Sequence, residues 1–388
     1  MNNKILVNKI IKTISGVIKE NSKELHEPSL PKKEFKHINK TLSKNNFMLG
    51  PYIQKFENKI KNLTKSKYVV LTNTGSSALH LSLRLIDVKK NDEILIPTLH
   101  YISSVNSTLY CGATPHFIDI DENSLGVDCI KLENYLKKIS ILRGKKCINK
   151  TSGKIIKAII VLHVFGHSAN LKHIQKICKK FKLIMIEDAA EAIGSYNKNQ
   201  HLGTFGKIGI LSFNGNKTIS SAGGGAILTS DKKLAKKAKY LVSNAKIPHI
   251  WKYSYKEIGY NYRMPNINAA IGFLHMKYLK KILTEKRKLF HKYKKSFSKF
   301  NFIKILNEPN ECKSNFWLQT LILGKNKGSL RYKLLKTGYD KKIKLRPAWE
   351  LLHTLKHLRK YPRMNLDNAA KIHKRIINIP SSSFLPAT

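Results

Sequence analysis

From about residue 67, the sequence alternates between short apolar runs and longer amphipathic stretches. The apolar runs are rich in Ile, Val and Leu, as buried strands are, and the stretches between them have helical spacing. Strands that alternate with helices favour an α/β fold with a mostly parallel sheet, because each helix returns the chain to the start of the next strand. In order, the segments are "KYVVLTN", "ALHLSLRLI", "DEILIP", "PHFIDID", "KAIIVLHVFG", "LKHIQKICKKF", "KLIMIEDA", "IGILSFN" and "GGAILTSD".

The alternation weakens after residue 245, which indicates a second, smaller domain. Residues 266–297, "NINAAIGFLHMKYLKKILTEKRKLFHKYKKSF", predict one long helix that leads into it. A chain of 388 residues is long enough for two domains. We therefore expect a large domain over residues 31–245 and a small C-terminal α/β domain over residues 246–388.

The first 30 residues are expected to form a helical arm. Leu6, Ile10 and Ile14 recur on one helix face, and lysines interrupt the segment, so a docked helix is favoured over an export signal. Residues 94–118 contain no Asp, Glu, Lys or Arg, but their prolines, histidines and hydroxyl groups make them too polar for a membrane span. We expect no membrane association.

The chain is very basic, with 72 Lys and Arg against 24 Asp and Glu and a formal net charge of +48. Lysine is spread through every segment and does not gather in one tail or one arginine-rich strip, so specific nucleic-acid binding is disfavoured. A charge-driven nucleic-acid-binding protein remains an alternative. The five cysteines are an odd number without a close pair, which fits a reducing, cytoplasmic location and neither a disulfide framework nor a zinc site.

The first candidate site feature is the turn in "VVLTNTGSSALHLSL", where an apolar run ends and a helix begins. A helix N-terminus presents unpaired N–H groups and a partial positive charge, and Gly75 lets the backbone approach a bound phosphate. The alternative is that these Ser and Thr residues only cap the helix.

The second feature is "KLIMIEDAAEAIGS", an apolar strand that runs directly into Glu187 and Asp188. The carboxyl edge of a parallel sheet is where α/β proteins bind their ligands. Asp188 is therefore a candidate site residue, although a strand-end aspartate can also serve only as a helix cap.

The third feature is "SFNGNKTISSAGGG", which follows another strand and places Lys217 in a short loop of small and polar residues. A lysine that faces an aspartate and a phosphate-binding turn is what a pyridoxal phosphate enzyme requires. The lysine amine bonds to the cofactor aldehyde, and the aspartate keeps the ring nitrogen protonated. The alternative, a solvated loop lysine, becomes unfavourable once the three features are taken together.

Five stretches in order resemble the DegT/StrS family of pyridoxal phosphate-dependent sugar-nucleotide aminotransferases: "NTGSSALHLSL", "IEDAAEAIGS", "SFNGNK", "GGGAILT" and "GYNYRMPNINAAIG". Finer details, "AKIPHIWKY", "RPAWELLH" and "RIINIPSS", are similar to the branch that serves legionaminic acid and bacillosamine-type sugars. The resemblance implies the fold type I aminotransferase architecture, with a seven-stranded, mostly parallel sheet. It also implies a homodimer with shared active sites.

The resemblance implies roles for particular residues. Lys217 would be the Schiff-base lysine and the base that moves the proton, and Asp188 would pair with the ring nitrogen. The expected cofactor-binding set is Gly75, Ser76, Tyr101, Glu191, Ser212 and Asn261, together with Lys217 and Asp188. Within it, Gly75, Ser76 and Ser212 would bind the phosphate and Tyr101 would stack on the ring, unless Tyr101 is simply part of the core. Asn261 would reach the phosphate of the neighbouring subunit.

Four further residues are candidates for the nucleotide-sugar pocket, because arginine suits a diphosphate and aromatic rings suit a base or sugar face. They are Trp251, Arg263, Arg346 and Trp349. His163 and His167 have no metal partners at ligand spacing, so we expect packed or hydrogen-bonded roles and no metal site.

The sequence thus predicts a cytoplasmic, homodimeric aminotransferase that moves an amino group, with L-glutamate as the expected donor, onto a nucleotide-linked 4-keto-6-deoxy sugar. Two other readings remain besides nucleic-acid binding. A relative that removes the sugar 3-hydroxyl is disfavoured, because such relatives lack the lysine that Lys217 supplies. A catalytically idle regulator with the same fold is disfavoured by the intact Lys217 and Asp188 pair.

Overall fold

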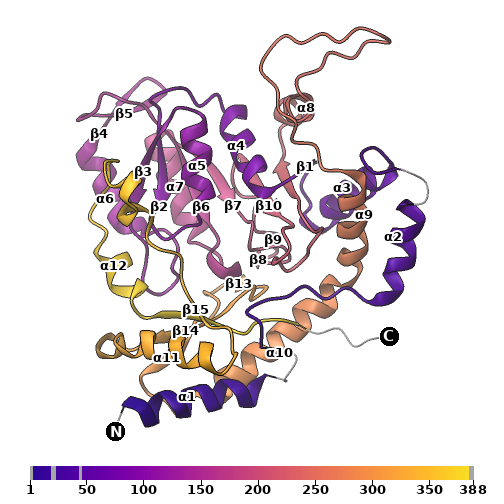
Figure 1. The fold of residues 1–388 in the computed structure, drawn as a ribbon. Helices are drawn as coiled ribbons and strands as arrows, with labels where there is room; N and C mark the ends of the chain where they lie inside the picture. Colours follow the sequence, from indigo (N-terminus) through magenta and orange to yellow (C-terminus); the bar gives the residue numbers. More distant parts are fainter. Residues whose placement is uncertain (1–2, 19–22, 43–45, 384–388) are drawn as a thin grey trace.

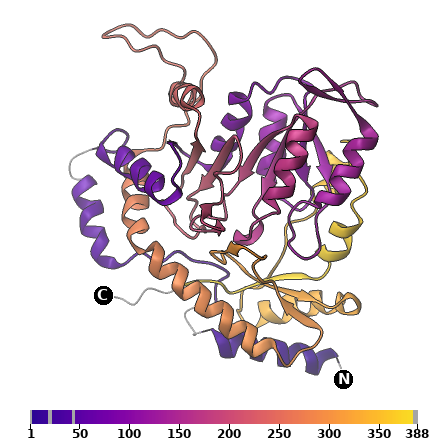
Figure 2. The same ribbon diagram turned by 180° about the vertical axis from the view of Figure 1, so that it is seen from behind.

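A computed structural model describes residues 3–18, 23–42 and 46–383 (Figures 1 and 2). Its centre is a seven-stranded sheet with the order β1-β11-β10-β7-β6-β2-β3. Only β11 runs antiparallel to its neighbours, β1 and β10, so the predicted fold class is confirmed. The strands are β1 (Tyr68–Thr72), β2 (Glu93–Pro97), β3 (Thr114–Ile118), β6 (Ile156–Leu162), β7 (Ile184–Asp188), β10 (Ile208–Ser212) and β11 (Gly225–Thr229).

Helices cover this sheet, and every residue of β2, β3, β10 and β11 is buried, as expected for strands with both faces covered. Helix α4 packs against α5 and α8, and α6 packs against α7. Because β1, β7 and β10 run in the same direction, their carboxyl ends meet at one edge. The helices are α3 (Pro51–Thr64), α4 (Gly75–Leu85), α5 (Ser103–Tyr110), α6 (Cys129–Ile139), α7 (Leu171–Phe181) and α8 (Lys232–Leu241).

A second, antiparallel sheet of four strands has the order β12-β14-β16-β15. Its strands are β12 (Ile303–Ile305), β14 (Gln319–Leu323), β15 (Arg346–Pro347) and β16 (Ile376–Ile379), and the accompanying helices are α10 (Leu279–Phe297) and α11 (Leu330–Asp340). The predicted N-terminal helix is present as α1 (Asn3–Val17). It buries Leu6, Ile10 and Ile14 in the same core as α10 and α11, below the large sheet in Figure 1.

The long helix predicted over residues 266–297 is interrupted, which corrects that prediction. Helix α9 (Asn266–His275) packs against α3, and a 3₁₀ turn (Met276–Tyr278) separates it from α10, which continues toward the second sheet. At the turn, Lys277 Nζ and Tyr278 Oη donate hydrogen bonds to Glu34, at 3.0 and 2.7 Å. These contacts fix the turn between the two helices to the segment around Glu34.

After β15 the chain returns to the large sheet. Leu352 N donates to Thr98 O and Met364 N donates to Phe117 O, so this segment runs beside β2 and β3 before α12 (Asp367–His373). The remaining elements are α2 (Phe35–Leu42), the hairpin β4 (Ser140–Arg143) and β5 (Lys146–Asn149), and the small sheet of β8 (Tyr196–Asn197), β9 (Gln200–His201) and β13 (Cys312–Lys313). Within the described ranges, no helix is long and apolar enough to cross a bilayer.

Candidate active site

The turn after β1 forms one wall of the site. Thr74 caps α4, its Oγ1 accepting the N–H of Ser77 at 2.9 Å, and the helix begins at Gly75. The N–H groups of a first helical turn have no partner within the helix. A Cβ added to Gly75 would lie 2.9 Å from Cβ of Ser212, at the end of β10. The close approach places the Ser212 hydroxyl beside the helix N-terminus, and together they form a cradle for an anion.

Asp188 ends β7 and is buried. Its Oδ1 accepts the N–H of Ala190 at 3.0 Å, and its Oδ2 lies 3.6 Å from Nε2 of His100. His100 is fully buried, its Nδ1 lies 3.0 Å from the carbonyl of Tyr101, and burial lowers its pKa. Each carboxylate oxygen accepts about two hydrogen bonds, so Asp188 retains capacity for a further donor in the cleft.

Lys217 lies in the loop after β10, between a carboxyl group and an aromatic ring. Its Nζ is 3.4 Å from Oε1 of Glu191 and 3.9 Å from the ring centre of Trp317. Glu191 Oε2 accepts the N–H of Phe165 at 2.9 Å. Burial raises the pKa of Glu191 to about 7, although Lys217 opposes the shift. The charge of this carboxyl therefore changes near neutral pH.

These features open into one cleft of about 620 Å³. It lies between the carboxyl edge of the large sheet and the segment from Arg346 to Glu350, which begins in β15. Nine of the twelve predicted site residues line it: Gly75, Ser76, Tyr101, Asp188, Glu191, Ser212, Lys217, Arg346 and Trp349. Residues that are far apart in the chain thus meet in one place.

Tyr101 lies at the mouth of the cleft and is not a core residue, since 53% of its surface is exposed. Its ring meets Trp349 edge-on with centroids 6.4 Å apart, and Trp349 packs on Phe165 at 5.4 Å. The aromatic pair therefore joins the large sheet to the segment after β15 at the entrance.

The other three predicted residues, Trp251, Asn261 and Arg263, do not line this cleft. All three are exposed, Trp251 at 72%, and they belong to the segment between α8 and α9. Part of this segment projects from the molecule in Figure 1, whereas Asn261 pairs with Ser243, next to α8. Asn261 is nevertheless anchored close to the α4 turn, because Asn73 donates from Nδ2 to the Asn261 carbonyl at 3.3 Å. Within one chain, they do not contribute to the site.

Glu187 and the two histidines have structural roles. His163 Nε2 lies 2.9 Å from Glu187 Oε2, and Glu187 also accepts backbone N–H groups of the loop before β10, including Gly203 at 2.8 Å. His167 is buried edge-on against Phe316. No group of three or more His, Cys, Asp or Glu in the described part of the chain is arranged to hold a metal ion.

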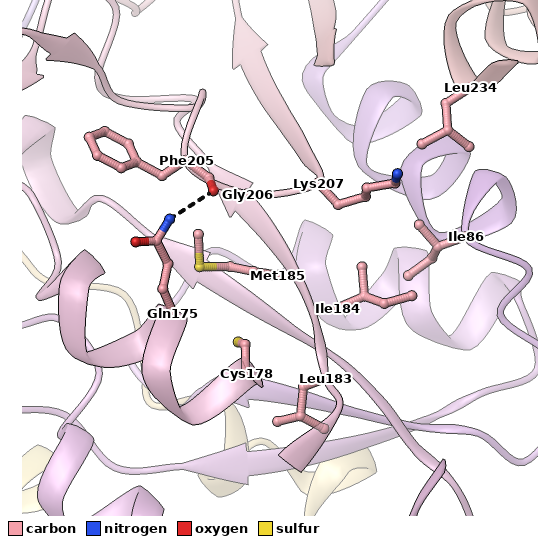
Figure 3. A pocket seen from close by; sticks show the side chains of 10 residues that line it. All are labelled: Ile86, Gln175, Cys178, Leu183, Ile184, Met185, Phe205, Gly206, Lys207 and Leu234. Atoms are coloured by element: carbon pink, nitrogen blue, oxygen red, sulfur yellow. Dashed lines mark hydrogen bonds between the residues drawn. The ribbon is translucent and has the colours of Figure 1, made fainter. Parts of the chain in front are cut away.

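A second hollow, of about 450 Å³, lies at the start of β7 and β10, at the opposite ends of these strands (Figure 3). Its lining is mostly apolar, and Gln175 Nε2 donates to the Phe205 carbonyl across it at 3.1 Å. Burial raises the pKa of the Cys178 thiol to about 12, so this thiol stays protonated and unreactive. The amine of Lys207, which also lines the hollow, is paired with Asp231 at 2.7 Å. The cleft around Lys217 is therefore the candidate active site.

Residues 28–386 match the DegT/DnrJ/EryC1/StrS aminotransferase family. The chain belongs to this family. It is 34% identical to GDP-perosamine synthase of Escherichia coli O157:H7 over 361 residues, 92% of each chain. It is 33% identical to EpsN of Bacillus subtilis strain 168, named as a pyridoxal phosphate-dependent aminotransferase, over 306 residues, 79% of this chain and 76% of EpsN. Among solved structures, Helicobacter pylori PseC, an aminotransferase involved in the biosynthesis of pseudoaminic acid, superposes with a TM-score of 0.83 at 22% identity, covering 92% of this chain and 93% of PseC.

These matches confirm the predicted family, enzyme class and cofactor: the chain is a DegT/DnrJ/EryC1/StrS aminotransferase, and it depends on pyridoxal phosphate. The geometry fits that cofactor independently. The cradle of α4 and Ser212 suits its phosphate, Asp188 retains hydrogen-bonding capacity for its ring N–H, and Lys217 lies in the same cleft. The finer assignment to the legionaminic acid and bacillosamine branch stays a prediction.

The family motifs do not include every residue that shapes the site. Trp317 and Asn315 come from the loop before β14, about 100 residues after Lys217, and His100 precedes Tyr101. A lone Trp in "NFWLQTL" has no local pattern that distinguishes it from a core residue. Only the fold brings its ring to Lys217.

Proposed function

We propose that this aminotransferase transfers an amino group from L-glutamate to the C4 ketone of a nucleotide-linked 4-keto-6-deoxy hexose or N-acetylhexose. The product is a 4-amino sugar nucleotide for legionaminic acid or a related surface glycan. The observation that supports this most is that one cleft is lined by Lys217, Asp188 and the α4 cradle together with Arg346 and Trp349.

When bound, pyridoxal phosphate supplies an aldehyde for the amino group and a ring that accepts electrons. The protein residues bind the cofactor and move the protons. Gly75, Ser76 and Ser212 would hold the phosphate, and Asp188 would accept the ring N–H and so keep that nitrogen protonated. Lys217 would provide the amine that bonds to the aldehyde and the base that accepts and returns a proton.

Glu191 supports Lys217 in this exchange. At 3.4 Å it can accept or return a proton, and its pKa of about 7 lets it hold either state at neutral pH. Its buried position, with Phe165 N–H fixing Oε2, keeps it from turning toward solvent.

The segment after β15 provides the substrate side. Arg346 carries a permanent positive charge at the edge of the cleft, which suits a diphosphate, and Trp349 offers a ring for a sugar or base face. Relatives include a GDP-perosamine synthase, so both GDP-linked and UDP-linked ketosugars are substrates to test.

We infer a homodimer with shared active sites. The projecting segment exposes Ile250 at 89%, Trp251 at 72% and Tyr253 at 76%, an apolar surface that favours a protein contact. A second copy would cover it and receive Asn261 and Arg263 at its cleft. The test is sedimentation equilibrium of the wild type and Trp251→Asp: a monomeric wild type would contradict the inference.

We propose a three-part domain division into an arm (1–30), a large domain (31–245) and a small domain (246–388). Residues 1–2 and 19–22 of the arm and residues 384–388 of the small domain lie outside the described residues. The separate core formed by α10, α11 and the second sheet supports a small domain, and the arm packs into that core through α1. We also propose a cytoplasmic location, which suits five cysteines that are all free thiols in the structure.

The experiment that tests the proposed function follows the first half-reaction. We expect the wild type loaded with cofactor to convert L-glutamate to one equivalent of 2-oxoglutarate, and Lys217→Ala to lose turnover while remaining folded. Lys333→Ala, which changes an exposed lysine on α11, serves as the matched control. Normal turnover in Lys217→Ala would contradict the proposal.

Each alternative predicts a different result, in this experiment or in an assay with added sugar nucleotide or DNA. An idle regulator would bind the cofactor without releasing 2-oxoglutarate, and a 3-deoxygenating enzyme would return a sugar that has lost its 3-hydroxyl. A nucleic-acid-binding protein would retain DNA tightly, in a salt-sensitive and sequence-independent manner. The intact pair of Lys217 and Asp188 in one cleft favours the aminotransferase.

A further inference from the structure

We propose that Trp317 is a positioning residue for the reacting amine: it holds the Lys217 nitrogen in place through its ring and fixes the adjacent backbone through its indole N–H. This inference rests on the proposed role of Lys217. It assigns a function to a residue outside the motifs that define the family resemblance.

Trp317 contacts the lysine at two points. Lys217 Nζ lies 3.9 Å from the ring centre, and Trp317 Nε1 donates to the carbonyl of Asn216 at 2.8 Å. Asn216 immediately precedes Lys217. Trp317 therefore contacts both the backbone from which the Lys217 side chain begins and the amine at which it ends. A cation–π contact is stronger when it is shielded from water, and Trp317 is only 2% exposed.

The loop that carries Trp317 is itself fixed. Asn315 Oδ1 accepts the N–H of Trp317 at 2.8 Å, and the buried Lys286 donates to the Trp317 carbonyl at 3.1 Å. The Nδ2 of Asn315 also donates to the carbonyl of Glu191 at 2.8 Å. Asn315 therefore orders both neighbours of Lys217, the ring and the carboxyl group, relative to each other.

The contacts that Glu191 and Trp317 make with Lys217 respond differently to pH. Glu191 attracts Lys217 only while it is ionised, and its charge changes near neutral pH. The indole ring does not titrate. The other charged or titratable groups that line the same cleft are Asp188, Glu350, Arg346 and Tyr101. The buried His100 and the half-buried His26 also lie near Lys217, and their pKa values are lowered mainly by burial. Trp317 is thus the contact that holds the amine in place whatever the charge of Glu191.

The test compares Trp317→Leu and Trp317→Phe with the wild type. Cofactor affinity is measured by absorbance titration at pH 6 and pH 8. Borohydride reduction then fixes the cofactor on whichever lysine it has bonded, and peptide mass spectrometry gives the fraction on Lys217. Phe300→Leu is the matched control, because Phe300 is a buried ring outside the cleft that also lies near lysine ammonium groups, those of Lys299 and Lys9.

We expect Trp317→Leu to weaken cofactor binding about tenfold and to lower the fraction fixed on Lys217. Trp317→Phe keeps a ring, so its cofactor affinity and its fraction fixed on Lys217 should fall less, although it lacks the N–H bond to Asn216. Phe300→Leu should lower thermal stability and leave both readouts unchanged.

Wild-type affinity and wild-type attachment in Trp317→Leu would overturn the inference. If Trp317→Leu does not fold, Trp317→Phe decides alone: unchanged affinity at both pH values together with unchanged attachment would overturn it. Attachment of the cofactor to a lysine other than Lys217 in the wild type would instead contradict the proposed function.

Discussion

Gly75 lies directly against Ser212: a Cβ on Gly75 would be 2.9 Å from the Ser212 Cβ and 3.1 Å from its Oγ. The contact joins the N-terminus of α4 to the end of β10, and the anion cradle depends on it. No larger residue fits at this position unless one of the two elements moves.

Gly75→Ala is therefore expected to weaken cofactor binding at least tenfold, because separating α4 from Ser212 opens the cradle. Absorbance titration with pyridoxal phosphate measures the effect. Gly16→Ala is the control, since a Cβ on Gly16 meets no atom within 4 Å. Equal affinities for the two variants would show that the cradle is not the phosphate site.

Glu191→Gln should change how stability depends on pH. The pKa of Glu191 is raised to about 7 in the folded protein, so the folded state keeps a proton that the unfolded state releases above pH 4.5. Its contribution to stability is lost as pH rises from 4.5 to 7. Gln does not titrate. The free energy of unfolding of Glu191→Gln relative to that of the wild type should therefore rise by about 2–3 kcal/mol between pH 5 and pH 8. Urea unfolding of the cofactor-free proteins measures this, and parallel curves would contradict it.

His167→Phe should make the protein more resistant to acid. Burial lowers the pKa of His167 to about 4, so the unfolded chain binds a proton below pH 6.5 that the folded chain does not. Stability is therefore lost as pH falls from 6.5 toward 4, by about 2 kcal/mol between pH 7 and pH 5 for this group. Phe keeps a ring against Phe316 and removes the titration. The same loss of stability in both proteins over this range would rule out this explanation.

Gly166 and Gly144 form a matched pair, since both have positive φ, +98° and +58°. At Gly144 a Cβ would meet no atom within 4 Å, so Ala should cost only the backbone strain, about 1–2 kcal/mol. At Gly166 a Cβ would clash with the side chain of Asn315, which orders Glu191 and Trp317. We expect Gly166→Ala to lower the free energy of unfolding by about 3 kcal/mol or more and to weaken cofactor binding. Similar free energies of unfolding for the two variants would contradict the role given to Asn315.

The sequence was informative where chemistry and local structure coincide. Gly75, Asp188 and Lys217 each follow a recognisable strand, and parallel strands bring their carboxyl ends to one edge, so their meeting could be predicted. The family motifs added Tyr101, Arg346 and Trp349, which line the same cleft.

Long-range contacts could not be predicted in this way. Trp317 reaches Lys217 only because the loop before β14 packs against the large sheet, and no periodicity records that contact. The break between α9 and α10 has the same origin, since it depends on Glu34 binding to the turn at Lys277 and Tyr278. Tertiary contacts overrode a continuous helical pattern there.

The central claim, amino transfer to a nucleotide-linked ketosugar, is tested most directly by identifying the product. The enzyme loaded with cofactor is incubated with ¹⁵N-labelled L-glutamate and, in parallel, UDP-4-keto-6-deoxy-N-acetylglucosamine and GDP-4-keto-6-deoxymannose, and the sugars are examined by NMR. The account predicts that one of them acquires ¹⁵N at C4, with coupling constants that give the configuration of the amine. A sugar that loses its 3-hydroxyl, or the absence of any aminated sugar although glutamate still aminates the cofactor, would contradict it.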